Sequence, residues 1–364
     1  MEWDSGMAEW YSIRSVREAS GPVAARVWCQ VESVRRKQTK TGKPYLDIAL
    51  RDAEDNVALK VWEDAPAFVV AEGLRPGDPV EVDGEWSSGA YGLECRNCQF
   101  RKLREPEVVE LLGGPAELRE RQAADWDDIT EFVAGMKDPR LRTLSRWFLD
   151  SYGERFRRTA AARDYHHARR GGLVEHVAQM MRSADALCGA YPRLNRDLVL
   201  AGVLFHDCGK LWENSFPETG FTMPFTESGE LLGHIPIGME LVNRLWRDLL
   251  ENEEAAEWKT LEPANDQVRL HLLHLIASHH GEHEFGTPTL PRTPEAIALH
   301  HIDNIDAKLE MIFRGYETSP ELGRNIFERV RPLPARLVRP LAPFQFSDKP
   351  REDDSRERLP ADEA

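Results

Sequence analysis

All 12 histidines of this 364-residue chain lie between His166 and His301. Neutral imidazole offers a lone pair near physiological pH, which makes histidine the commonest metal ligand in proteins. Neighbouring carboxylates add negative charge and fix the orientation of the ring. The concentration of histidines therefore predicts a metal site within this segment.

The candidate ligands are imidazoles and carboxylates at the ends of different predicted helices. They are His176, His206, Asp207, His234, the adjacent pair His279 and His280, and Asp303. His206 and Asp207 are consecutive and point about 100° apart on a helix, so they reach one ion together only in its last turn. A set of nitrogen and oxygen donors without an obvious thiolate favours Mn, Fe, Co or Mg over a structural zinc site. Two ions are feasible, and a pair suits phosphoester hydrolysis.

Three other histidines have settings that argue against metal ligation. His271 and His274 lie on an apolar helical segment, which favours packing or support of a ligand. His283 follows Gly281 and is expected in an exposed loop.

The elements that must position these residues differ between the two parts of the chain. Alternating segments with turn signals between them predict strands over 23–34, 45–52, 56–63, 79–86 and 92–103. Short strands in this number are typical of a small closed barrel of the OB type. The later pattern is helical, with a mostly apolar helix over 197–208 and a helix over 295–316 that begins after Thr293. The predicted fold class is α+β, with a small N-terminal β-barrel followed by an all-α domain.

We expect five regions along the chain. They are an N-terminal extension (1–20), the OB-type barrel (21–104), an acidic linker or covering helix (105–135), the helical metal-binding domain (136–330), and a C-terminal extension that ends in a disordered tail (331–364).

The net charge of −15 argues against a nucleic-acid partner only superficially. The acidic excess is confined to three stretches, 105–135, 248–266 and 347–364, and the remainder is about neutral. Within that remainder, residues 136–174 are basic, so a basic entrance to the site is feasible.

Cysteine usage and hydropathy indicate a reducing compartment and no membrane. The 5 cysteines are an odd number and too few for a disulfide framework. Cys95 and Cys98 form a lone C-x-x-C pair, which we interpret as strand residues and not as a metal or redox site. No apolar run reaches the roughly 18 residues of a membrane helix, and the N-terminus does not resemble a secretion signal. We therefore expect a cytoplasmic protein.

Basic and aromatic residues of the barrel predict a grip on single-stranded nucleic acid. The segment between the first two predicted strands contains Arg35, Arg36, Lys37, Lys40 and Lys43. OB-folds use such loops to hold single strands. Tyr45 and Trp62 lie on neighbouring predicted strands, where they could stack on bases.

Five ordered motifs resemble those of the HD superfamily of metal-dependent phosphohydrolases. They are AAARDYHHARRGGLVEHV (160–177), LVLAGVLFHDCGK (198–210), TESGELLGHI (226–235), LIASHHGEHEFGTP (275–288) and ALHHIDNIDAKLEM (298–311). The order of barrel and helical domain is similar to that of the YhaM family of 3'-to-5' exoribonucleases. The resemblance covers roughly residues 22–316, apart from the acidic stretches.

The resemblance implies a ligand set and substrate contacts. The implied ligands are His176, His206, Asp207 as a bridging carboxylate, His234, His279 and Asp303. His280 is an alternative to His279 and otherwise a substrate contact, and Asp306 is an alternative to Asp303. Lys210 would face the scissile phosphate. His167, with Arg169 or Arg170, is a further candidate contact to that phosphate.

These observations together predict a metal-dependent 3'-to-5' exonuclease that acts on single-stranded RNA or DNA. The expected cofactor is a divalent metal, with two ions and manganese preferred. One alternative is an HD phosphohydrolase that acts on a small nucleotide. Another is a non-catalytic nucleic-acid-binding protein. A homo-oligomer is compatible with the sequence.

Overall fold

The computed structural model describes residues 10–89, 92–163 and 165–342. The chain divides into two compact units, residues 1–310 and 311–364, which are described separately. The tail expected to be disordered (347–364) and the start of the N-terminal extension (1–9) lie outside the described residues. The domain boundaries expected from the sequence stay predictions.

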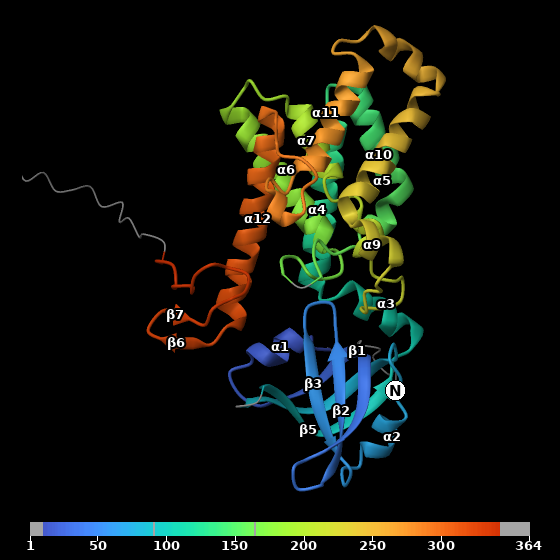
Figure 1. Ribbon diagram of the computed structural model, residues 1–364. Helices are drawn as coiled ribbons and strands as arrows, with labels where there is room; N and C mark the ends of the chain where they lie inside the picture. The colour runs from blue at the N-terminus through green and yellow to red at the C-terminus, as the bar shows by residue number, and fades with distance from the viewer. Residues whose placement is uncertain (1–9, 90–91, 164, 343–364) are drawn as a thin grey trace, which may run out of the picture. The chain divides into compact units, whose positions relative to one another are not determined.

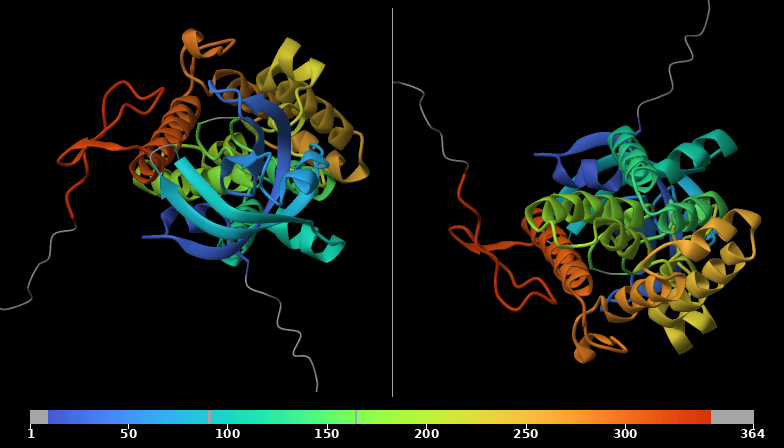
Figure 2. Two further views of the ribbon diagram at one scale, coloured as in Figure 1. Left: turned by 90° about the horizontal axis from the view of Figure 1, so that it is seen from below. Right: turned by 90° about the horizontal axis from the view of Figure 1, so that it is seen from above.

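The first unit begins with an antiparallel sheet that has all five predicted strands. They are β1 (Val23–Gln38), β2 (Pro44–Arg51), β3 (Asn56–Trp62), β4 (Pro79–Gly89) and β5 (Gly92–Lys102). The strand order is β3-β2-β1-β4-β5, and the outer strands β3 and β5 also contact each other (Figures 1 and 2). The sheet is thus consistent with an OB-like barrel. Cys95 and Cys98 lie in β5, as predicted.

Alternating burial along the strands builds the interior of this barrel. In β3, for example, Val57, Leu59 and Val61 are buried while their neighbours are exposed. Side chains at every second position point to the same face of a sheet, so this alternation fixes the register. Two short helices, α1 (Ile13–Glu18) and α2 (Phe68–Glu72), add buried side chains to the same core.

The loop between the first two strands is shorter than predicted, because part of the basic segment belongs to β1. Arg35, Arg36 and Lys37 belong to β1, and only residues 39–43 form the turn. The prediction was wrong here because a run of charged residues has no apolar alternation to mark a strand. The strand continues because its residues pair across the sheet, with Arg35 opposite Asp47 and Lys37 opposite Tyr45.

Helices make up most of the first unit after the barrel. They are α3 (Glu105–Gly113), α4 (Ala116–Ala134), α5 (Pro139–Phe156), α6 (Gly172–Ala190), α7 (Arg196–Phe205), α8 (Lys210–Glu213), α9 (Glu227–Leu232), α10 (His234–Leu250), α11 (Asn265–Ser278) and α12 (Pro294–Thr318), with 3-10 turns η1 (Glu253–Thr260) and η2 (His283–Phe285). The acidic stretch 105–135 forms α3 and α4. The predicted fold class, a β-barrel followed by a helical domain, is confirmed.

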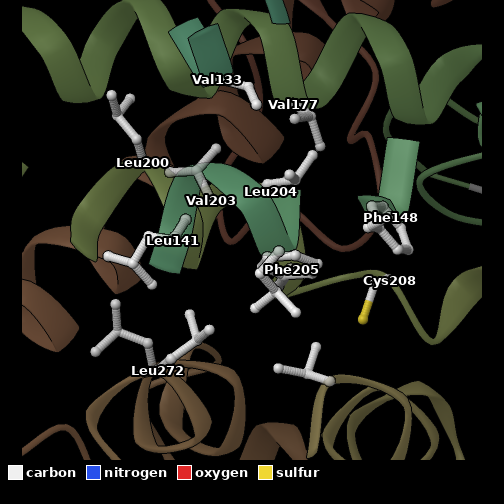
Figure 3. Packing of buried hydrophobic residues seen from close by; sticks show 14 of the residues in the cluster. Val133, Leu141, Phe148, Val177, Leu200, Val203, Leu204, Phe205, Cys208 and Leu272 are labelled. Atoms are coloured by element: carbon white, nitrogen blue, oxygen red, sulfur yellow. The ribbon is translucent and has the colours of Figure 1, made fainter. Parts of the chain in front are cut away.

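The apolar helix α7 lies at the centre of the helical core. Every residue from Asp197 to Phe205 is buried. Figure 3 shows Leu200, Val203, Leu204 and Phe205 beside side chains from the surrounding helices. The helix ends at Phe205, earlier than the predicted 208, so His206 and Asp207 follow directly from a rigidly packed element.

The second unit contains the end of α12 and two short strands. These are β6 (Glu321–Gly323) and β7 (Ile326–Phe327), which pair antiparallel. Phe327, Leu333 and Leu337 form a small buried cluster of their own.

A search of the described helices finds none that is both long and apolar enough to cross a membrane.

Asp52 links the β2–β3 hairpin to α1 through hydrogen bonds, and its replacement tests how much these bonds stabilise the barrel. The side chain is 4% exposed and accepts backbone N–H bonds from Ile13 (2.6 Å), Glu54 (2.9 Å) and Asp55 (2.8 Å). Asp52→Ala leaves these donors without their partner, so we expect the barrel to lose roughly 1–3 kcal/mol of stability. Scanning calorimetry of the full chain measures this. Asp83→Ala, at an exposed ion pair with Arg26, is the control and should cause no measurable loss.

Candidate metal centre

Helix ends deliver most of the predicted ligands to one place. His176 lies near the start of α6, His206 and Asp207 follow α7, and His234 is the first residue of α10. His279 and His280 follow α11, and Asp303 lies within α12. The structure brings all of these residues together in the first unit. Figure 1 shows the helices that carry them.

One group of ligand atoms surrounds the Nε2 atom of His176. This atom lies 3.3 Å from His206 Nε2, 3.4 Å from Asp303 Oδ1 and 3.9 Å from Asp207 Oδ2. His206 Nε2 is itself 3.3 Å from Asp207 Oδ2. Two imidazoles and two carboxylates thus converge, which is a donor set suited to a divalent cation.

A second group of ligand atoms surrounds Oδ1, the other carboxylate oxygen of Asp207. Asp207 Oδ1 is 3.4 Å from His234 Nε2 and 3.6 Å from His279 Nε2. His280 joins His234 and His279 in a set of ligand atoms within 4.8 Å of one another. Asp207 Oδ1, His234 Nε2 and His279 Nε2 are buried and have no hydrogen-bond partner. Buried polar atoms without partners are costly, and a shared cation would satisfy all three.

The outer nitrogen of each histidine is fixed by an acceptor, which determines what the inner nitrogen can do. The Nδ1 contacts are His176 to Asp306 (2.6 Å), His206 to Val203 O (2.8 Å), His234 to Glu213 (3.1 Å), His279 to Ile276 O (2.8 Å) and His280 to Phe285 O (2.7 Å). When Nδ1–H donates to these oxygens, Nε2 presents its lone pair to the centre. Asp306 is therefore on the outer side of His176, whereas Asp303 faces the inner side.

The charges of the centre keep its carboxylate ionised. Burial raises the pKa of Asp207, but Lys210 and His206 outweigh it and hold that pKa well below the usual range. Lys210 Nζ lies 2.7 Å from Asp207 Oδ2 and 2.5 Å from the carbonyl oxygen of Ala161. Burial lowers the pKa of His279 well below its ordinary value, so this ring is neutral. Its Nε2 lone pair is then available to a metal.

The substrate contacts expected before α6 are bonded within the protein. His167 is 7% exposed, and its Nε2 lies 3.1 Å from Asp306 Oδ2. The guanidinium of Arg169 bonds to Glu175 and to Glu310. His166 was not among the predicted site residues, and its ring lies 5.6 Å from that of His176. The only signal was its place in the same His-His pair, and the sequence did not show which ring turns inward.

The weaker histidine candidates lie apart from these ligand groups. His271 is exposed on α11, and His274 Nε2 accepts a hydrogen bond from the backbone N–H of Arg292 (3.0 Å). His283 is exposed in η2, as expected.

The predicted nucleic-acid contacts divide between two places on the barrel. Tyr45 and Trp62 are opposite each other on β2 and β3, with ring centroids 5.4 Å apart. Lys37 lies beside Tyr45, and Lys43 Nζ is 5.1 Å from the Trp62 ring centroid. Arg36 instead bonds to Glu63 and Glu72 and lies over the Phe68 ring, away from this pair. Lys40 is exposed in the turn, and Arg35 is exposed on β1.

Comparison with known proteins agrees with this geometry. Residues 173–308 match the HD domain, so the helical part is an HD-domain protein, a class that depends on a divalent metal. Relatives named 3'-5' exoribonuclease YhaM include one from Geobacillus sp., 32% identical over 295 residues, which cover 80% of this chain and 84% of the relative. One from Oceanobacillus iheyensis is 33% identical (79% and 85% covered), and one from Bacillus licheniformis is 32% identical (79% and 86%).

The chain therefore belongs to the YhaM family of 3'-5' exoribonucleases. It is a hydrolase that acts on phosphodiester bonds, and the interpretation as a non-catalytic binding protein is set aside.

Gly209 tests how closely the centre depends on backbone packing. A Cβ atom at this position would lie 1.9 Å from the carbonyl oxygen of His234, a contact that forces the start of α10 to move. We expect Gly209→Ala to weaken metal binding roughly 10- to 100-fold, the range seen when residues behind a ligand are lost. Metal titration followed by elemental analysis measures the change.

Gly189→Ala is the matched control, because a Cβ at Gly189 meets nothing within 4 Å. It should bind metal as the wild type does. Unchanged metal affinity in Gly209→Ala would show that His234 is not held by this contact.

Proposed function

We propose that the protein hydrolyses single-stranded RNA from the 3' end at an HD centre that holds two divalent ions. The observation that carries the proposal is the buried carboxylate of Asp207, whose two oxygens face two separate groups of imidazole nitrogens. The names of the relatives support the direction of cleavage and the choice of RNA.

The chain's own residues suggest how two ions would be shared. One ion would be held by His176, His206, Asp207 and Asp303, and the other by Asp207, His234, His279 and His280. His280 is thus assigned to the metal in place of the substrate contact expected from the sequence, because it belongs to the second group and its Nδ1 is already bonded to Phe285. Mixed nitrogen and oxygen donors favour Mn, with Fe, Co or Mg as alternatives. When bound, such ions supply an activated water and stabilise charge on the scissile phosphate.

Other side chains orient these ligands. Asp306 and Glu213 accept the Nδ1 protons of His176 and His234, which turns the inner nitrogens toward the centre. Asp303 and Asp306 outweigh burial and raise the pKa of His176 to about 10, so metal binding at its Nε2 would release a proton. Lys210 stabilises the negative charge of Asp207. The contact of Lys210 with the scissile phosphate stays a prediction, since two of its donors are used by Asp207 and Ala161.

The barrel supports the choice of a single-stranded substrate. Tyr45 and Trp62 form an aromatic pair on the outer side of β2 and β3, and Trp62 is 36% exposed. Lys37, Lys43 and Lys60 surround the pair, with Lys60 Nζ 6.0 Å from the Tyr45 ring centroid. Aromatic rings stack on any base, and cations beside them bind the phosphate backbone.

A cleavage assay tests the proposed activity. A 5'-labelled single-stranded RNA is incubated with protein and Mn²⁺, and the products are resolved at single-nucleotide steps. We expect a ladder that shortens from the 3' end, is abolished by EDTA, and is reduced at least 10³-fold in Asp207→Ala, because both ligand groups lose their shared carboxylate. The exposed Asp150→Ala on α5 is the control and should cleave normally.

Two other results would contradict the proposal. If Asp207→Ala cleaves the RNA at the wild-type rate, the HD centre is not the site of hydrolysis. Absence of a ladder with the wild type, together with turnover of small nucleotides, would favour a small-nucleotide phosphohydrolase. A parallel assay with DNA of the same sequence decides between the two nucleic acids.

The aromatic pair yields a separate prediction on binding. Trp62→Ala removes one stacking surface, so we expect the affinity for an oligo-uridine strand to fall roughly 5- to 150-fold, as stacking on one base contributes about 1–3 kcal/mol. Fluorescence anisotropy with EDTA present measures binding without cleavage. Tyr191→Ala, at a 63% exposed aromatic of the helical domain, should bind as the wild type does. Equal affinities of all three proteins would show that Tyr45 and Trp62 do not contribute to RNA binding.

A further inference from the structure

The two consecutive histidines before α6 turn in different directions. His167 has a φ of 45° and is bonded to Asp306, behind His176. The His166 and His167 rings lie almost equally far from the His176 ring, with 5.6 Å and 5.7 Å between centroids, but only His167 is bonded to Asp306, and His166 is half-buried. The charges that act on His166 come from His176, Lys210, Asp303 and Asp207. Its surroundings are therefore those of the metal centre itself.

His166 also differs from the cluster histidines in its hydrogen bonds. Each of the other rings is held through Nδ1 by a carbonyl or carboxylate oxygen. The rings of His167 and His176 lie beside that of His166, which forms no hydrogen bond among the described residues. A half-buried imidazole at a charged centre thus keeps its N–H available for an added molecule.

The basic side chains near this segment are occupied. Lys210 is bonded to Asp207 and Ala161, and Arg169 to Glu175 and Glu310. Arg163 donates to the carbonyl oxygens of Glu213 and Pro224, and Arg170 to those of Pro217, Glu218 and Gly220. A phosphate at the centre would meet the carboxylates of Asp207 and Asp303 and needs donors to offset them. Lys210 and Arg169 have further N–H groups, but both side chains are held beside carboxylates, whereas no acceptor among the described residues holds the N–H of His166.

We propose that His166 binds the phosphate that the centre hydrolyses, by donating an imidazole N–H hydrogen bond to a non-bridging phosphate oxygen. The inference rests on the proposed function and extends it, because it replaces His167 and Arg169 as the expected phosphate contacts. His166 touches the substrate in this arrangement and is not a metal ligand.

Binding of adenosine 5'-monophosphate to the manganese-loaded full chain tests this role. Calorimetric titration compares the wild type, His166→Ala and His166→Gln, with metal content and thermal unfolding measured on each protein. A hydrogen bond to a charged oxygen predicts roughly a 10- to 100-fold weaker affinity in His166→Ala. His166→Gln retains a side-chain N–H donor and should recover affinity to within about threefold of the wild type. The exposed His283→Ala is the matched control and should bind normally.

Each outcome decides the proposal. Wild-type affinity in His166→Ala would overturn it, as would loss of bound metal in that variant or failure of the wild type to bind the nucleotide. Weakened nucleotide binding with full metal content and an unchanged unfolding temperature would establish it. The cleavage assay tests the proposed function separately. If the protein binds the nucleotide through His166 but does not cleave RNA, the exonuclease proposal is wrong and the proposed phosphate contact still holds.

Discussion

The burial of a charged carboxylate among imidazole lone pairs is the constraint on which the helical domain depends. Asp207 is 2% exposed, and both of its oxygens face imidazole nitrogens. Lys210 pairs with Oδ2, but Oδ1 has no hydrogen-bond partner, so packing elsewhere must hold these buried polar atoms in place. The fully buried α7 provides that support, because its apolar residues fix the position from which His206 and Asp207 emerge.

Helix ends suit this centre because they combine rigidity with open space. A side chain in mid-helix is crowded by its neighbours, whereas one at an end projects beyond the last turn. His234 follows Gly233, whose φ of 71° is a left-handed conformation that glycine adopts without strain. Gly281, with a φ of 78°, follows His280 in the same way, and a Cβ there would overlap the His300 ring. Backbone geometry that glycine adopts without strain therefore lies next to His234 and His280, two members of the second ligand group.

The sequence predicted the strands and the convergence of ligands, but not which neighbouring residue faces inward. Alternation identified all five strands because one face of each is buried. The order of the histidine motifs predicted the candidate metal centre, because imidazoles and carboxylates on several separate helices rarely converge unless they bind a metal. The choices between His166 and His167, and between Asp303 and Asp306, depend on side-chain direction. For the two histidines, the positive φ of His167 turns the chain between them, and no residue pattern reveals it.

The acidic net charge and the basic outer side of the barrel are compatible because two of its lysines are already paired with carboxylates. Lys37 bonds to Asp47 and Lys43 to Asp64, both at partly exposed positions where ion pairs are weak. A phosphate backbone that exchanges with these carboxylates releases fewer counterions than one that meets unpaired lysines. The salt dependence of RNA affinity should then be shallow for the number of lysines present, and stacking on Tyr45 and Trp62 should carry a larger share of the binding free energy. This division suits a protein that binds any base sequence, because stacking on an aromatic ring tolerates every base.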